Sequence, residues 1–244
     1  MLIGIIGDIH ANIDALNATL DALDRLSVSK IYCTGDVVGY GGAPAECISA
    51  IRGRGIDCVC GNHDSYVAHP GIYDNRNVRH EAAQVIEWTR GVLSENDIQW
   101  LASLPLLIEN DDFMITHASC QPYPQWKYVI NARTASIHLL FQQKQLCFNS
   151  HSHVPILAAH KPGHRVFFDF FHDTTIPNDR YTVVGVGAVG QPRDDDPRAC
   201  AMLFDTNERR VTMLRVQYDI KSAQQRIFDN NLPSSLATRI ALGK

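Results

Sequence analysis

Residues 2–10 read LIGIIGDIH, an isoleucine-rich apolar run that passes through Gly7 into Asp8 and His10. A short apolar run rich in β-branched residues predicts a buried strand. A glycine followed by an acidic residue and a histidine then places two groups that can bind a metal where that strand ends. The same pattern, a buried strand followed by polar residues that can bind a metal, recurs after later strands of the chain.

The first sixty residues alternate between strand and helix patterns. After the opening strand, apolar spacing predicts a helix over residues 12–26 and a strand over 30–35. A helix that begins at Pro44 follows over 44–52, and then a strand over 56–60. A β-α-β-α-β order predicts a parallel sheet with right-handed crossover connections.

The rest of the chain first carries two helical patterns within 79–103, the second beginning after Ser94. A helix near 131–142 interrupts a strand-rich region, and two helices close the chain at 219–230 and 234–242. Strands are predicted at 112–116, 145–149, 154–159, 165–170, 181–187, 200–205 and 211–218. Without a linker or repeat, these patterns predict one α/β domain with two sheets over residues 1–244.

The composition of the 244 residues limits the function classes. The net charge is −4 and no run of Lys or Arg exceeds two residues, which argues against a nucleic-acid partner. We expect no membrane partner, because no apolar run approaches the roughly 20 residues of a membrane span. Nothing resembles a signal peptide, so a cytoplasmic protein is expected. The oligomeric state is not indicated.

The seven cysteines are odd in number and include no CxxC pair, so free buried thiols are expected. Cys58 and Cys60 precede a histidine in IDCVCGNHDS (56–65), which at first suggests part of a zinc site. No second cysteine pair stands at a suitable spacing, so both are interpreted as core thiols of the third strand.

Metal-capable side chains follow each predicted strand of the first half. Gly-Asp-Ile-His, Gly-Asp and Gly-Asn-His-Asp follow the first three strands, and the strands at 112–116 and 145–149 run into His117 and into Ser-His-Ser-His. Ligands in open α/β sheets bind outside the carboxyl ends of the strands. The residues expected to converge there are Asp8, His10, Asp36, Asn62, His63, His117, His151 and His153.

Each of these elements alone has a structural explanation, such as a turn or a satisfied core histidine. Together they supply two carboxylates, four imidazoles and one amide oxygen, apart from His63. Seven donors exceed one tetrahedral zinc and suit two divalent ions, with Asp36 as the bridging ligand. Oxygen and imidazole donors without thiolate favour manganese, with iron, zinc, nickel or magnesium as alternatives.

The order DxH, GD, GNHD, a single His and HxH resembles the calcineurin-like metallophosphoesterase superfamily. The stretches GDVVGYGGAP (35–44) and VGQPRDDDPRA (189–199) are similar to its compact bacterial and archaeal phosphodiesterases, a group that includes enzymes annotated for diadenosine polyphosphates. The resemblance covers essentially the whole chain. It implies an αββα sandwich of two mixed sheets flanked by helices and a metal-dependent phosphoric ester hydrolase.

The resemblance also implies roles for single residues. One metal would bind Asp8, His10, Asp36 and His153, and the second Asp36, Asn62, His117 and His151. His63 would stay off the metals beside the leaving group, where it stabilises or protonates it. Asp64 either orients the His63 ring or is an exposed residue at a helix start.

Two positions depart from the family pattern. Ser150 replaces the glycine that usually precedes HxH, a change that needs only an allowed backbone angle. Val38-Gly39-Tyr40 stands where protein Ser/Thr phosphatases carry an arginine, which puts a phosphoprotein substrate in doubt.

The function predicted is hydrolysis of a small soluble phosphate ester or anhydride, such as a nucleotide or dinucleoside polyphosphate, by a metal-bridging hydroxide. Asn12 contacts phosphate or caps the following helix, with the cap favoured. Tyr40 and Trp126 are candidates to stack on a base, with buried packing favoured for Trp126. Arg193 contacts phosphate or is a surface residue, with the surface role favoured. The alternatives are a non-catalytic scaffold with the same fold and a nuclease of the same superfamily.

Overall fold

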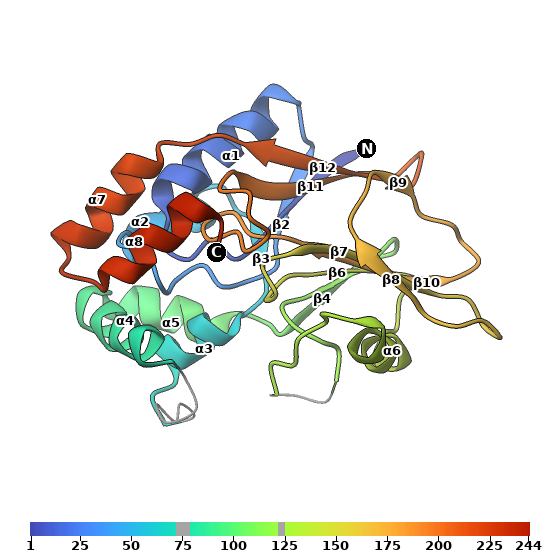
Figure 1. Ribbon diagram of the computed structural model, residues 1–244, viewed down its shortest axis with the longest axis horizontal. Coiled ribbons are helices and arrows are strands. Elements are labelled where there is room, and N and C mark those ends of the chain that lie inside the picture. Colours follow the sequence, from blue (N-terminus) through green and yellow to red (C-terminus); the bar gives the residue numbers. More distant parts are fainter. Residues whose placement is uncertain (72–78, 122–124) are drawn as a thin grey trace.

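The chain folds into two six-stranded β-sheets that lie between layers of helices (Figure 1). The computed structural model describes residues 1–71, 79–121 and 125–244. Each sheet contains both parallel and antiparallel pairs. The predicted α/β fold with two mixed sheets flanked by helices is confirmed, and the assignment of the whole chain to one domain stays a prediction.

The first sheet is built on the N-terminal strands. Its order is β3 (Asp57–Cys58), β2 (Lys30–Cys33), β1 (Leu2–Ile6), β11 (Ala199–Asp205), β12 (Arg210–Val216) and β9 (Thr174–Thr175). The first three strands run parallel, as predicted. Two helices connect them, α1 (Ile13–Arg25) and α2 (Pro44–Gly53). Because β1, β2 and β3 are parallel, the carboxyl ends of these three strands lie at one edge of the sheet.

The second sheet has its parallel strands in the middle. Its order is β4 (Leu107–Glu109), β5 (Met114–Thr116), β6 (Leu146–Asn149), β10 (Tyr181–Val186), β7 (Pro155–His160) and β8 (Phe167–Phe170). Strands β5, β6 and β10 are parallel, and the outer pairs are antiparallel.

Large apolar side chains fill the space between the sheets. Phe113 contacts Phe148 and Phe204 edge to face, with ring centroids 5.4 and 5.8 Å apart, and all three are at most 1% exposed. A second apolar layer joins the first sheet to α1 and α2, and a third joins the second sheet to α6 (Ala132–Phe141). These layers hold the ends of the central strands in fixed positions.

The remaining helices cover the first sheet and its loops (Figure 1). They are α3 (Asn62–Ala68), α4 (His80–Val92), α5 (Glu95–Ser103), α7 (Ile220–Asp229) and α8 (Ser234–Leu242). Val85 of α4 packs with Ile227 of α7 and Leu236 of α8 in a separate apolar cluster. No helix in the described ranges is long and apolar enough to cross a membrane.

The sequence patterns missed α3, β4 and β9, and they extended the third strand beyond its two residues. β4 and β9 have only three and two residues, too few for a periodic signal. Helix α3 buries polar residues in its first turn, Asn62, His63, Asp64 and Ser65, so it lacks the usual amphipathic pattern.

Candidate metal centre

Loops from five strands meet at one edge of the two sheets. β1 leads to Asp8 and His10, β2 to Asp36, β5 to His117 and β6 to His151 and His153, while the loop after β3 leads into α3. The structure thus brings together all seven predicted ligands, each at most 7% exposed: Asp8, His10, Asp36, Asn62, His117, His151 and His153.

Tight backbone turns aim these side chains inward. Asp8, His10, Asp36, His151 and His153 have φ between 47° and 67°, a left-handed conformation that non-glycine residues seldom adopt. Backbone hydrogen bonds lock the turns; the amide of Asp8 donates to the Gly35 carbonyl and that of His10 to the Asp36 carbonyl, at 3.0 and 2.9 Å. Strain held in this way concentrates at functional sites.

The first histidine pair consists of His10 and His153. Nδ1 of His10 lies 3.1 Å from the Val38 carbonyl, and Nδ1 of His153 lies 2.6 Å from the Gln191 carbonyl. A carbonyl only accepts, so each Nδ1 carries the proton and each Nε2 presents a lone pair. The two Nε2 atoms are 3.2 Å apart. Asp8 completes this group of donor atoms.

The second histidine pair, His117 and His151, has the same arrangement. Nδ1 of His117 donates to the Thr34 carbonyl at 2.9 Å, and Nε2 of His151 donates to the Trp126 carbonyl at 3.0 Å. The opposite ring nitrogens face each other at 3.1 Å. Nε2 of His117 also lies 3.1 Å from Oδ1 of Asn62 and 3.3 Å from Oδ2 of Asp36.

These two clusters fit cations. In the first pair, the lone pairs of two neutral rings face each other at 3.2 Å and repel, and a positive ion between them would remove the repulsion. Oδ1 of Asp8 and Oδ2 of Asp36 are buried without a hydrogen-bond partner, as expected of atoms reserved for an ion. Asp36 also lies 3.6 Å from Nε2 of His10, so it is within reach of both clusters.

The pKa values of the site follow from burial and from its two carboxylates. Burial lowers the pKa of His151 to about 3 and that of His10 and His153 well below the usual range, which leaves these rings neutral. Burial opposes the charge on His117 too, but the Asp36 carboxylate raises its pKa to about 9. The charged His117 ring thus neutralises Asp36 at 3.3 Å, and a metal ion that binds beside Asp36 would displace the Nε2 proton of His117.

His63 lies against the first cluster. Its ring centroid is 4.9 Å from that of His10 and 4.5 Å from that of Tyr40. Its backbone amide donates to Oδ1 of Asp36 at 2.8 Å, and its buried Nδ1 has no hydrogen-bond partner in the structure. Burial lowers the pKa of His63 to about 4, so the ring is neutral before substrate binds.

The expectation of an exposed Asp64 is wrong, because this side chain is fully buried. One carboxylate oxygen accepts from the amide of Gly61 at 3.0 Å and the other from the amide of Val38 at 3.2 Å. Asp64 thus caps α3 and ties it to the loop after β2. Both oxygens accept from backbone amides, and no hydrogen bond joins Asp64 to the His63 ring in the structure, so its predicted orienting role has no direct contact to support it.

The structure shows the capping alternative for Asn12. Its Oδ1 accepts from the amide of Ala15 at the start of α1, and its Nδ2 donates to the Gly190 carbonyl, at 3.1 and 3.0 Å. The departure at Ser150 is accommodated by a buried hydrogen bond, in which the Thr34 hydroxyl donates to Ser150 Oγ at 2.9 Å. Both residues serve the framework of the site.

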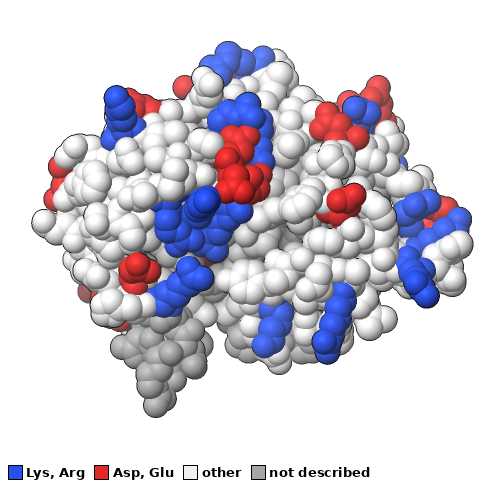
Figure 2. Space-filling view, in the orientation of Figure 1, with Lys and Arg blue, Asp and Glu red and all other residues white. Residues whose placement is uncertain are grey.

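A cleft of about 350 Å³ leads to the two clusters. Its walls include the predicted contacts Tyr40 and Arg193 and also Trp126, for which the sequence favours buried packing. They also include Arg79 and Tyr128, which sequence reasoning did not assign to the site. The Tyr128 ring stacks on His151 with centroids 4.0 Å apart. No motif marks these residues, because they reach the cleft from separate loops. Figure 2 shows one face of the molecule, with Lys and Arg side chains gathered near its middle beside a group of Asp and Glu side chains.

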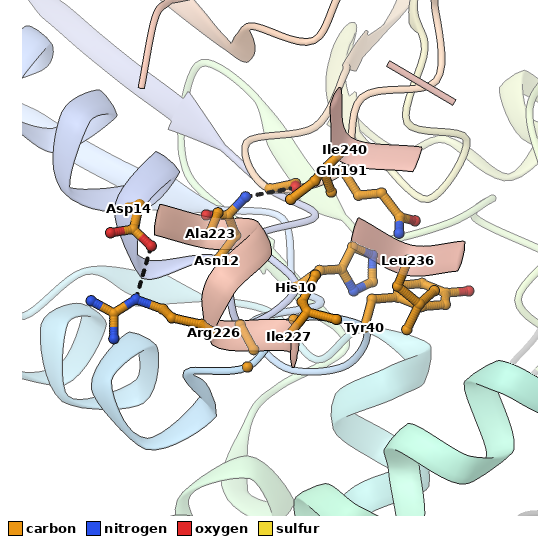
Figure 3. A pocket seen from close by; sticks show the side chains of 14 residues that line it. His10, Asn12, Asp14, Tyr40, Gln191, Ala223, Arg226, Ile227, Leu236 and Ile240 are labelled. Atoms are coloured by element: carbon orange, nitrogen blue, oxygen red, sulfur yellow. Dashed lines mark hydrogen bonds and ion pairs between the residues drawn. The ribbon is translucent and has the colours of Figure 1, made fainter. Parts of the chain in front are cut away.

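Helices α7 and α8 close the other side of the site loops (Figure 3). Arg226 of α7 forms an ion pair with Asp14 at 2.9 Å, and Ile227 and Leu236 lie against the loops of His10 and Tyr40. The cavity left between them holds only about 10 Å³, so it is a packing contact without room for a ligand.

Two mixed sheets that deliver buried carboxylates and imidazoles to one edge define a metallophosphoesterase fold. Residues 1–209 match the model of the calcineurin-like phosphoesterase superfamily domain, and the chain belongs to this superfamily. It is a phosphoric ester hydrolase, and members of this superfamily generally depend on divalent metal ions.

Solved structures and curated sequences agree with this assignment. A metallophosphoesterase from Sphaerobacter thermophilus is 35% identical with a TM-score of 0.86, over 100% of this chain and 99% of that one. An uncharacterised protein of Methanocaldococcus jannaschii is 34% identical over 100% of this chain and 98% of its own length. The symmetrical bis(5'-nucleosyl)-tetraphosphatase of Haemophilus influenzae is 27% identical over 48% of this chain and 44% of its own.

Proposed function

We propose that this protein hydrolyses a small soluble phosphate ester or anhydride with two divalent ions, manganese first among them. Asp8, His10, Asp36 and His153 would hold one ion, and Asp36, Asn62, His117 and His151 would hold the other. The observation that carries the proposal is the pair of facing ring nitrogens in each of two clusters, 3.2 and 3.1 Å apart, with Asp36 lying 3.6 Å from His10 and 3.3 Å from His117. Carbonyl partners fix the tautomer of every ring.

Two such ions, when bound, supply positive charge to the phosphoryl oxygens and make hydroxide available from water near neutral pH. Other side chains act on the leaving group of the substrate. His63 lies beside the first cluster with a buried, unpartnered Nδ1. It donates a proton or a hydrogen bond to the leaving oxygen, and Asp64 holds the start of its helix in place.

Arginines at the cleft mouth favour a substrate with more than one phosphate. Arg193 and Arg79 line the cleft, and Nε of Arg193 is buried without a partner. Burial and the charges of Arg193 and Arg79 lower the pKa of Arg239, so its guanidinium group lies within electrostatic range of both. Guanidinium groups bind phosphate by paired hydrogen bonds. The charge of this cleft suits nucleotides and dinucleoside polyphosphates, and Tyr40 lines it with the Arg193 guanidinium 5.7 Å from its ring centroid.

The experiment below also tests two alternative functions, a non-catalytic scaffold and a nuclease. A scaffold of this fold would bind partners without turnover, and a nuclease would cut DNA. The filled set of donors argues against the first, and the net charge of −4 argues against the second. The cytoplasmic location and the single-domain organisation stay predictions.

The test is hydrolysis of bis-p-nitrophenyl phosphate by metal-stripped protein with and without added Mn²⁺, followed by EDTA. A panel of phosphomonoesters, cyclic nucleotides and dinucleoside polyphosphates then identifies the substrate class. His10→Ala should remove activity, whereas His164→Ala, at an exposed histidine that is not among the proposed donors, should keep it. Activity that survives EDTA or His10→Ala would contradict the proposal.

A further inference from the structure

A second cluster of reactive side chains lies outside the metal centre. Cys120 follows β5, Cys147 lies on β6 and His138 lies on α6, which covers the outer face of the second sheet. Their sulfur and ring nitrogen atoms are within 4.8 Å of one another. None of the three is among the residues assigned to the phosphoesterase site.

The hydrogen bonds of His138 fix its proton. The backbone amide of Cys120 donates to Nδ1 of His138 at 3.1 Å, so Nδ1 carries a lone pair. The proton of the neutral ring is then on Nε2, which lies 3.7 Å from Sγ of Cys120. An Nε2–H that faces a sulfur donates to it and cannot bind a metal, so the three residues form an activated thiol instead of a zinc site.

The neighbours of Cys120 stabilise its thiolate. The Cys147 thiol, within 4.8 Å, and the hydrogen bond from His138 lower the pKa of Cys120 to about 5, against the opposing effects of burial and of Glu109. Cys147 itself stays a thiol, because burial raises its pKa well above the usual range. The pair therefore combines an ionised sulfur with a protonated one beside it.

Access distinguishes Cys120 from the other cysteines. The expectation of seven free buried thiols holds for six, whereas Cys120 is only partly buried. It lines a cleft of about 230 Å³ together with Thr116, Lys127 and Phe141. A small reagent can reach this sulfur from the cleft, and the buried Cys147 thiol lies within 4.8 Å of it.

We propose that Cys120 is a thiol modification site, activated by His138 and resolved by Cys147. The reagent is a peroxide: the Cys120 thiolate attacks one oxygen, the S–O bond forms, the O–O bond breaks and hydroxide leaves. The Cys147 sulfur then attacks the resulting sulfenic acid, an S–S bond forms, and the sulfenic oxygen leaves as water with the proton of Cys147. A dithiol such as dithiothreitol reverses the modification.

The first test is alkylation of the folded protein by limiting iodoacetamide at pH 6, mapped by mass spectrometry. A thiol of pKa about 5 is mostly ionised at this pH, whereas an ordinary thiol of pKa about 8.5 is roughly 0.3% ionised. The lower nucleophilicity of a more acidic thiolate removes much of this gain. We expect Cys120 to react about tenfold faster than a cysteine in a small peptide and ahead of the other six.

The second test uses peroxide and two cysteine variants. Wild-type protein should lose two hydrogen atoms and yield a Cys120–Cys147 disulfide, whereas Cys147→Ser should stop at a sulfenic acid that dimedone traps on Cys120. Cys200→Ser, at another buried cysteine, should behave as the wild type. His138→Gln, in a protein that circular dichroism shows to be folded, should lose the fast alkylation.

Either of two results would overturn the proposal. One is alkylation of Cys120 no faster than that of the other cysteines in both wild type and Cys147→Ser. The other is a tightly held zinc ion in the wild type that is absent from Cys120→Ser, because that would make the cluster a metal site.

Discussion

Gly39→Ala tests the position of His63 without touching any metal ligand. A Cβ at residue 39 would lie 2.5 Å from Nδ1 of His63, 2.9 Å from Cγ and 3.1 Å from Cβ. Carbon atoms in contact normally stay about 3.5–4.0 Å apart. The His63 ring must therefore move by about 1 Å, or the backbone of residue 39 must move away from it.

The expected losses can be given separately for catalysis and stability. Misplacement of a catalytic group by about 1 Å costs roughly 10²-fold in turnover. Residue 39 has φ of +94°, where alanine is strained, so unfolding free energy should fall by about 1–3 kcal/mol. The donor atoms of both clusters are unchanged, so both ions should stay bound.

The measurement is kcat of the manganese-loaded variant together with its metal content and its denaturant midpoint. Gly91→Ala is the matched control: it lies in α4 with open space around it, and alanine there should stabilise the protein by about 0.5–1 kcal/mol. If Gly39→Ala turned over substrate as fast as Gly91→Ala with two ions bound, the assigned position of His63 in the reaction would be wrong.

Three further substitutions separate the proposed roles. His63→Ala should keep both ions and lower turnover by about 10²-fold or more, and unchanged turnover in the metal-replete variant would refute its role. Asp36→Asn should lose both ions in metal analysis, and two ions still bound would remove Asp36 as the bridge. Asn12→Ala should lower unfolding free energy by about 1 kcal/mol through the lost helix cap with KM unchanged; a raised KM would instead make Asn12 a substrate contact.

Local patterns in the sequence predicted the fold and the convergence of the site. The β-α-β-α-β order is visible because strand and helix periodicities are properties of a few consecutive residues. Given parallel strands, the ends of β1, β2 and β3 must share an edge, so Asp8 and Asp36 were expected to meet. Nothing beyond the chain order of the motifs was needed for this step.

The atoms that orient the ligands could not be predicted in the same way. The carbonyls of Val38, Gln191, Thr34 and Trp126 fix the histidine tautomers, and every residue type has such a carbonyl. The true partners of Asp64 were equally hidden, since one of them, the Val38 amide, is 26 residues away in sequence. Long-range backbone contacts depend on the finished fold and leave no side-chain signal.

The strain in the site loops links the proposed cations to stability. Left-handed non-glycine residues cost about 1–3 kcal/mol each, and five of the seven proposed ligands adopt this conformation: Asp8, His10, Asp36, His151 and His153. That sum is comparable with the whole stability of a typical domain, about 5–15 kcal/mol. Backbone bonds to the strand ends offset part of it, such as the Gly190 amide that donates to the Asp8 carbonyl at 2.9 Å. An ion present at about a hundred times its Kd would add about 2.7 kcal/mol. The cations proposed to activate the substrate would therefore also stabilise the strained loops that hold them.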